Sequence, residues 1–262
     1  MYEHHRASIN NLINYFKDDI GVMAIILGGS IAKGCARVDS DVDAMVVVSQ
    51  EKYNKLAKNN QLAECITGHC TYEDGYFDIK YFTLEYLMSV MENGSEPSRN
   101  AFKSSRLLYS TSSKIEECVN KIPVFQKQEK QEKLLSFYSA FNLNYTYFWG
   151  ASSNDIYLRT RAATDIVLFG FRLLLQESEV LFPCHKGLIK FVTDLKNKPE
   201  DIINKANKLL TTLSDESKDD FVNSILNFIG YKPPEDFSEV LTRFVEDNEL
   251  WWYKERPVIA EW

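Results

Sequence analysis

Two aspartates that follow a glycine-rich turn could together carry out metal-dependent chemistry on a phosphate group. The turn is Gly28-Gly29-Ser30, and after ten intervening residues come Asp41 and Asp43. Side chains alternate along a strand, so both carboxylates would share one face. Carboxylates about 6–7 Å apart repel each other unless a cation lies between them. Because Mg²⁺ prefers oxygen ligands and completes its shell with substrate phosphates, the pair predicts a Mg²⁺ site.

Short apolar runs flank this motif and predict the strands that position it. Residues 23–27 and 44–48 are apolar and bounded by polar or glycine residues, which predicts two buried strands. Residues 30–33 can form a short helix after the turn, and anions are favoured at a helix N-terminus. Gly28, Gly29, Ser30 and Lys33 are therefore candidate ligands for the phosphates of a nucleotide.

The motif resembles the signature of the DNA polymerase β-like nucleotidyltransferase superfamily. That signature is a hydrophobic residue, Gly, Gly or Ser, a spacer and then Asp-x-Asp. Here Gly29-Ser30 is followed by Asp41 and Asp43, with Ser40 directly before the first carboxylate. The resemblance covers roughly residues 23–82. It implies that both aspartates hold Mg²⁺ and that ATP or another nucleoside triphosphate is the co-substrate.

The superfamily pattern also includes a third carboxylate on a neighbouring strand. The best match is Asp78, within residues 75–82, where apolar and polar positions alternate as in a half-buried strand. Glu73 and Asp74 are rivals, although they precede the strand in a turn-like stretch. The resemblance implies that Asp78 is a third metal ligand and accepts the proton of the attacking hydroxyl.

Composition and charge are those of an ordinary globular protein. Of the 262 residues, 45% are hydrophobic and 26% are charged, and no apolar run approaches the ~20 residues that span a membrane. The first residues lack the apolar core of a signal peptide, so we expect a cytoplasmic protein. The net charge of −7 disfavours long nucleic acid and favours a small cationic acceptor. Monomer and homodimer both remain open.

The cysteines do not indicate a metal centre or a disulfide framework. There are five, scattered along the chain, and their number is odd. Cys65, His69 and Cys70 form a local group, but it lacks the fourth ligand of a structural zinc site.

The pattern of helices and strands divides the chain in two. Residues 1–122 alternate strand and helix signals, which predicts an α/β (α+β) catalytic domain with a mixed sheet flanked by helices. Residues 123–262 carry long amphipathic stretches, including 155–179, which predict an α-helical bundle that covers the nucleotide or the substrate. We expect residues 93–98 to form a loop.

This two-part layout is similar to that of the kanamycin, streptomycin and lincosamide nucleotidyltransferases. The similarity implies Mg²⁺-dependent transfer of a nucleoside monophosphate, AMP from ATP, to a hydroxyl of a small molecule, with release of pyrophosphate. An aminoglycoside-type antibiotic is one candidate acceptor. It also implies that Lys186, which follows a Pro turn, reaches the triphosphate, although a plain surface lysine fits that position equally well.

Several alternatives remain at this stage. The acceptor could instead be a protein, as in AMPylating antitoxin-type transferases, or the fold could serve as a non-catalytic nucleotide sensor. Arg159, Arg161 and Arg172 are either snorkelling side chains or phosphate ligands. Residues 251–253 (Trp-Trp-Tyr) either line an acceptor cleft or dock a last helix.

Overall fold

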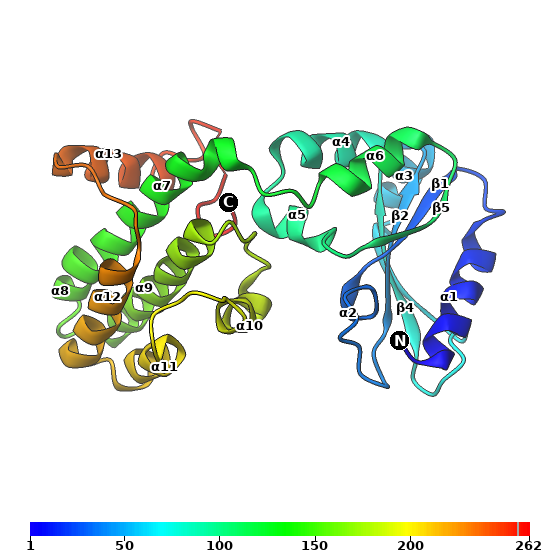
Figure 1. The fold of residues 1–262 in the computed structure, drawn as a ribbon. Helices are drawn as coiled ribbons and strands as arrows, with labels where there is room; N and C mark the ends of the chain where they lie inside the picture. Colours follow the sequence, from blue (N-terminus) through cyan, green and yellow to red (C-terminus); the bar gives the residue numbers. More distant parts are fainter. Residues whose placement is uncertain (256) are drawn as a thin grey trace. The chain divides into compact units, whose positions relative to one another are not determined.

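The chain folds into two compact units, residues 1–124 and 125–262 (Figure 1). The structure is a computed structural model that describes residues 1–255 and 257–262. The first unit has hydrophobic cores on both faces of a sheet, and the second has one large core between helices. The functions predicted for residues 1–122 and 123–262 stay predictions.

The first unit alternates strands and helices. Its strands are β1 (Val22–Leu27), β2 (Val42–Val48), β3 (Ala63–Thr67), β4 (Tyr76–Phe82) and β5 (Arg106–Ser110). Its helices are α1 (Glu3–Phe16), α2 (Gly29–Ala32), α3 (Gln50–Lys58), α4 (Leu84–Asn93), α5 (Glu96–Ala101) and α6 (Ser113–Lys121). The predicted α/β class with a mixed sheet is confirmed.

The five strands form a sheet in the order β3-β4-β2-β1-β5. Strands β2 and β4 are parallel, and every other neighbouring pair is antiparallel. The register of the parallel pair sets Asp43 opposite Asp78. The central strand pair therefore brings together two acids that lie 35 residues apart in the sequence.

Side chains of β1 belong to both cores, one on each face of the sheet. Ile25 and Leu27 belong to the core that α1 covers, whereas Ala24 and Ile26 belong to the core that α4 and α6 cover. A strand buried on both faces reads as a continuous apolar run rather than as alternating residues, which is why residues 23–27 are apolar throughout.

Two short elements differ from the sequence expectation. Residues 93–98 are not all loop, because α5 begins at Glu96. Ser95 caps this helix by accepting a hydrogen bond from the Ser98 N–H, and Pro97 occupies its first turn, both of which favour helix initiation. Strand β3 was not foreseen, since this edge strand has half-exposed and exposed residues and includes Glu64 and Cys65.

The second unit contains helices and no strand in the part that the structure describes. Its longer helices are α7 (Lys130–Leu143), α9 (Ile156–Glu177), α11 (Ile202–Thr212), α12 (Asp215–Phe228) and α13 (Phe237–Asn248). Its shorter turns are η1 (Lys127–Glu129), η2 (Asn144–Phe148), α8 (Trp149–Ala151), η3 (His185–Gly187) and α10 (Leu188–Thr193). The predicted helical second half is confirmed.

Helix α9 is the central element of this unit. Asp155 caps it by accepting a hydrogen bond from the Leu158 N–H, and the residues from Ile166 to Gln176 are all buried. The amphipathic stretch predicted over residues 155–179 is not buried at its start: Ile156 is 73% exposed, because it lies in the first turn, before the helix enters the core. In the described residues, no helix is long and apolar enough to cross a membrane.

Candidate active site

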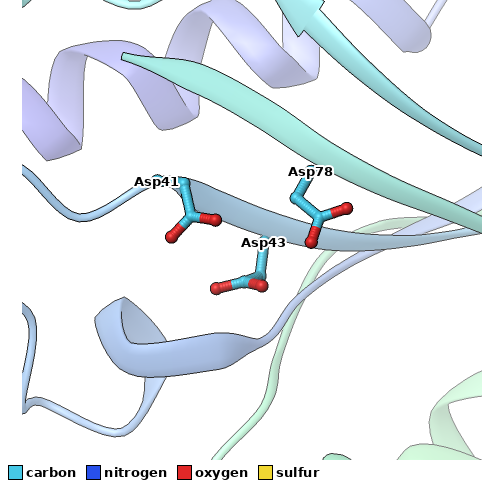
Figure 2. Close-up of side chains that lie close together, drawn as sticks. All are labelled: Asp41, Asp43 and Asp78. Carbon is cyan, nitrogen blue, oxygen red and sulfur yellow. The ribbon is translucent and has the colours of Figure 1, made fainter. Parts of the chain in front are cut away.

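Three carboxylates from two neighbouring strands converge at one edge of the first unit. Asp43 lies in β2, Asp78 lies opposite it in β4, and Asp41 directly precedes β2. One carboxylate oxygen of each lies within 4.8 Å of the other two, and all three residues are half-buried. Figure 2 shows the three side chains projecting to the same side of the sheet. The structure thus brings together the three acids that the sequence singled out.

The glycine turn lies against this cluster. Gly28 follows β1, and its N–H donates a 2.9 Å hydrogen bond to the backbone carbonyl of Asp43. Gly29, with φ +62°, then starts α2, in a left-handed conformation that glycine adopts without strain. The turn predicted to contact phosphate therefore begins beside Asp43.

The segment before Asp41 is held by side chains from other elements. The Tyr72 hydroxyl donates to the backbone carbonyl of Ser40 at 2.6 Å. The ring nitrogen Nε2 of His4 lies 2.9 Å from the Val38 carbonyl oxygen. Because these contacts fix the backbone next to Asp41, they restrict where its carboxylate can point.

Two further side chains on the same face of β4 act on the cluster. Lys80 Nζ lies 3.8 Å from Asp78 Oδ2 and is more than half exposed. The charge of Asp41, together with a hydrogen bond to its carboxylate, raises the pKa of the Tyr76 hydroxyl. Tyr76, Asp78 and Lys80 occupy every second position of β4, so their side chains share one face of the strand. This spacing is the sequence signal that could have identified Tyr76 and Lys80 as neighbours of Asp78.

The donor set fits a hard divalent cation. All three side chains offer carboxylate oxygens, and like charges held this close favour a cation between them. Oxygens bound to one Mg²⁺ at about 2.1 Å are at most about 4.2 Å apart, so small side-chain rotations would bring these oxygens within binding distance. The residues present therefore fit Mg²⁺.

The geometry and the family comparison point the same way. Residues 9–82 match the model of the nucleotidyltransferase domain family. These residues therefore form a nucleotidyltransferase domain. The resemblance to the DNA polymerase β-like superfamily is thereby confirmed, and the matched residues include the glycine turn and all three carboxylates. No curated protein sequence gives a significant match to this chain.

Two solved structures are similar to this chain. A nucleotidyltransferase-like protein from Exiguobacterium sibiricum 255-15 is 10% identical, with a TM-score of 0.43, over 95% of this chain and 78% of that chain. The spectinomycin adenyltransferase from Enterococcus faecialis, solved with ATP and spectinomycin, is 13% identical, with a TM-score of 0.32, over 90% of this chain and 95% of that chain.

The other predicted phosphate ligands occupy different places. Ser30 is half-buried in α2, whereas Lys33 is exposed at the end of that helix. Lys186 is exposed in η3 of the second unit. Their contacts with phosphate stay predictions. The rivals of Asp78, Glu73 and Asp74, are exposed and lie before β4, so neither belongs to the carboxylate cluster.

The three arginines of α9 all have protein partners. Arg159 lies 3.4 Å from Asp215 and over the Trp149 ring, and Arg161 pairs with Asp165 at 2.6 Å. Arg172 is fully buried and donates to backbone carbonyls near the end of the chain. These contacts favour the structural interpretation over phosphate binding for Arg159 and Arg172.

Two other groups of residues that the sequence singled out can also be located. Cys65, His69 and Cys70 do not form a metal-binding group among the residues that the structure describes. Residues 251–253 lie beyond the end of α13 and are exposed, so they do not dock that helix into the core.

Proposed function

We propose that this nucleotidyltransferase transfers a nucleoside monophosphate, AMP from ATP, to a hydroxyl group of a small molecule and releases pyrophosphate. The observation that carries the proposal is the convergence of Asp41, Asp43 and Asp78 beside the Gly28-Gly29 turn. A cluster of three carboxylates is costly without a cation, and its position beside the glycine turn suits a metal-bound polyphosphate.

The residues divide the work between binding and proton transfer. Asp41, Asp43 and Asp78 would hold Mg²⁺, which when bound supplies positive charge to the phosphate oxygens. Backbone N–H groups of the turn, with Ser30 and Lys33, would orient the triphosphate. The Tyr72–Ser40 contact would keep Asp41 in place. Positioning and charge neutralisation supply most of the acceleration in such reactions.

The reaction is an in-line displacement at the α-phosphorus. The acceptor oxygen forms a bond to that phosphorus, and the bond from the α-phosphorus to the oxygen that bridges to the β-phosphorus breaks. Pyrophosphate leaves with the electron pair of the broken bond. The proton of the acceptor hydroxyl passes to the Asp78 carboxylate.

The test is label transfer from α-³²P-ATP in the presence of Mg²⁺. The acceptors are a mixed panel of aminoglycosides, lincosamides and hydroxylated metabolites, with cell extract as a second source, and small-molecule and protein fractions are resolved. We expect label in a small-molecule product and its loss in Asp41→Asn. Label on protein would instead identify a protein-modifying transferase. ATP binding without label or pyrophosphate release in any fraction would identify a nucleotide sensor.

A further inference from the structure

A pocket in the first unit lies between the N-terminal half of α1 and the start of β5. Its volume is about 290 Å³, close to the lower end of the range for small-molecule sites. Residues of α1 and the residue at position 1 form one side, and the first residue of β5 forms the other. The lining residues are Met1, Arg6, Ile9, Asn10 and Arg106. Two of the five are arginines and none is an acid.

These two arginines differ from the other arginines that the structure describes. The other six have protein partners, which are carboxylates for four of them and backbone carbonyls for two: Arg37, Arg159, Arg161 and Arg243, and then Arg99 and Arg172. Within residues 1–255 and 257–262, the guanidinium groups of Arg6 and Arg106 have no hydrogen-bond, ion-pair or ring partner. Both unpartnered arginines of the described chain therefore line the same pocket.

The chemistry of the lining suits a phosphate group. Each guanidinium is permanently charged and offers a planar fork of N–H donors that matches two phosphate oxygens. Arg6 and Asn10 are four residues apart in α1, so they share one face of the helix, and the Asn10 amide can add a donor. Ile9 is only 6% exposed and belongs to the core that α1 covers, so it supplies an apolar floor.

The sheet separates this pocket from the carboxylate cluster. Arg106 lies opposite Leu27, and residues paired in this way project to the same face, which here is the face that α1 covers. Asp43 projects to the other face, because the adjacent Ala44 belongs to the core under α1 whereas Met45 belongs to the core under α4 and α6. The pocket and the carboxylates therefore lie at the same end of the sheet but on opposite faces.

We propose that this pocket binds a small phosphate monoester, with the phosphate between Arg6 and Arg106 and the organic part against Ile9. The inference goes beyond the proposed function, because the pocket contains no metal ligand and no step of the transfer uses it. A dianion between the two guanidinium groups offsets their mutual repulsion and links α1 to β5. Two arginines in a chain with a net charge of −7 disfavour a long nucleic acid as the ligand.

The test measures binding of phosphate compounds to the full chain without Mg²⁺ or nucleotide. The probes are glycerol 3-phosphate and inorganic phosphate, with glycerol as the uncharged counterpart, at a pH of about 8, where the phosphates are dianions. Binding is followed by calorimetry and by NMR of the arginine Nε–H groups. We expect saturable binding of both phosphates, with shifts in the signals of Arg6 and Arg106, and no binding of glycerol.

Substitutions at the two arginines test the assignment. Arg6→Gln and Arg106→Gln should each weaken glycerol 3-phosphate binding at least about 10-fold, because each removes charge-assisted hydrogen bonds. Arg106→Lys should weaken it by a smaller factor, since the charge remains but the fork of donors is lost.

The matched control is Arg37→Gln. It removes one guanidinium from the same unit, but Arg37 pairs with Asp39 and does not line the pocket, so phosphate binding should be unchanged. Equal losses in Arg37→Gln and Arg6→Gln, or no saturable binding of either phosphate, would overturn the inference. A short thymidine oligonucleotide that binds more tightly than glycerol 3-phosphate and shifts the same arginine signals would also overturn it, in favour of nucleic acid.

Two further measurements distinguish this pocket from the proposed reaction site. The double variant Asp41→Asn/Asp43→Asn should keep its affinity for glycerol 3-phosphate within about 2-fold, because the two sites share no residue. In Arg6→Gln, the KM for ATP should likewise stay within about 2-fold. A marked rise in that KM, or competition between Mg²⁺–ATP and glycerol 3-phosphate, would assign Arg6 to the nucleotide and overturn a separate site.

Discussion

Gly29 leaves no room for a side chain because the carboxylate of Asp43 occupies that space. A Cβ atom built on Gly29 would lie 1.7 Å from Asp43 Oδ2, and the backbone there has φ +62°. The glycine is thus required twice, once for its conformation and once for the close approach of a proposed metal ligand. This pair links the turn and the carboxylate cluster into one rigid unit.

Gly29→Ala should therefore reduce turnover at least about 100-fold, as expected when a charge-stabilising group is displaced. The chain should remain folded, because the turn lies after the end of β1, outside the strand pairing of the sheet. Turnover is measured as pyrophosphate release, and folding by circular dichroism and thermal melting.

Gly34→Ala is the matched control for backbone strain. Gly34 also has a positive φ, +73°, but a Cβ there meets no atom within 4 Å. We expect a loss of about 1 kcal/mol in the free energy of unfolding and unchanged turnover. If both alanine variants lost activity equally, strain in the turn rather than the clash with Asp43 would be responsible.

Mg²⁺ should stabilise the protein through the carboxylate cluster. Three acids with oxygens within 4.8 Å repel one another without a cation, and an ion that binds only the folded state raises its stability. Thermal melting with and without Mg²⁺ should show a rise in Tm for the unaltered protein and none for Asp43→Asn. Without Mg²⁺ the variant should be at least as stable as the unaltered protein. A metal-dependent rise that survives in the variant would place the ion elsewhere.

Lys80 should weaken metal binding, because its ammonium competes for Asp78. Lys80 Nζ lies 3.8 Å from Asp78 Oδ2, and the pair is partly exposed, so it contributes at most about 1 kcal/mol. Lys80→Gln should lower the Mg²⁺ concentration for half-maximal turnover, by up to about 5-fold. Lys55→Gln, an exposed substitution in α3, is the control for loss of a surface charge. A higher Mg²⁺ requirement in Lys80→Gln would show that Lys80 binds substrate phosphates instead.

The elements around the carboxylates are predictable from the sequence because local patterns dominate there. Continuous apolar runs mark β1 and β2, and the alternation Phe77-Asp78-Ile79 marks β4 with its acid on the polar face. What local patterns do not contain is the pairing of β2 with β4. That pairing sets Asp43 opposite Asp78 and depends on contacts across 35 residues.

The unforeseen features are those that other parts of the chain create. The Tyr72 hydroxyl donates a hydrogen bond to Ser40, 32 residues earlier in the sequence, and no short motif predicts that contact. Strand β3 has little apolar alternation of its own and exists because β4 offers it backbone partners. A pocket in the second unit likewise joins one face of α9 to His185 and Ala260, which are distant in sequence.

The contribution of Asp165 to the free energy of unfolding should fall as the pH rises. A salt-bridged acid with a lowered pKa shows the opposite dependence. Burial raises the pKa of this carboxyl in the folded state above 3.8. The folded state then holds the proton more tightly than the unfolded state. Its contribution to stability is fully present below about pH 3.8 and is lost as the pH rises through the folded-state pKa. The Tm of the unaltered protein minus that of Asp165→Asn should therefore fall as the pH rises through this interval.

The measurement is thermal melting of both proteins from pH 3 to pH 6.5 in steps of half a unit. Arg161 and His185, the charged groups that act on Asp165, are present in both proteins, so their direct contributions largely cancel in the difference. A difference in Tm that is constant, or that moves in favour of the unaltered protein as the pH rises, would contradict a raised pKa.

Arg172 should be a stability residue rather than a nucleotide ligand. Its guanidinium lies 4.2 Å from the ring centroids of Phe137 and Phe182, is fully buried, and donates to the backbone carbonyls of Ala260 and Trp262. Arg172→Met keeps much of the apolar volume but leaves those carbonyls without their donor, which should cost about 3 kcal/mol in the free energy of unfolding. Urea unfolding measures this loss, and the KM for ATP should stay within about 2-fold at a temperature where the variant is folded. A rise in the KM for ATP without a loss of stability would return Arg172 to the phosphate-binding role that the sequence left open.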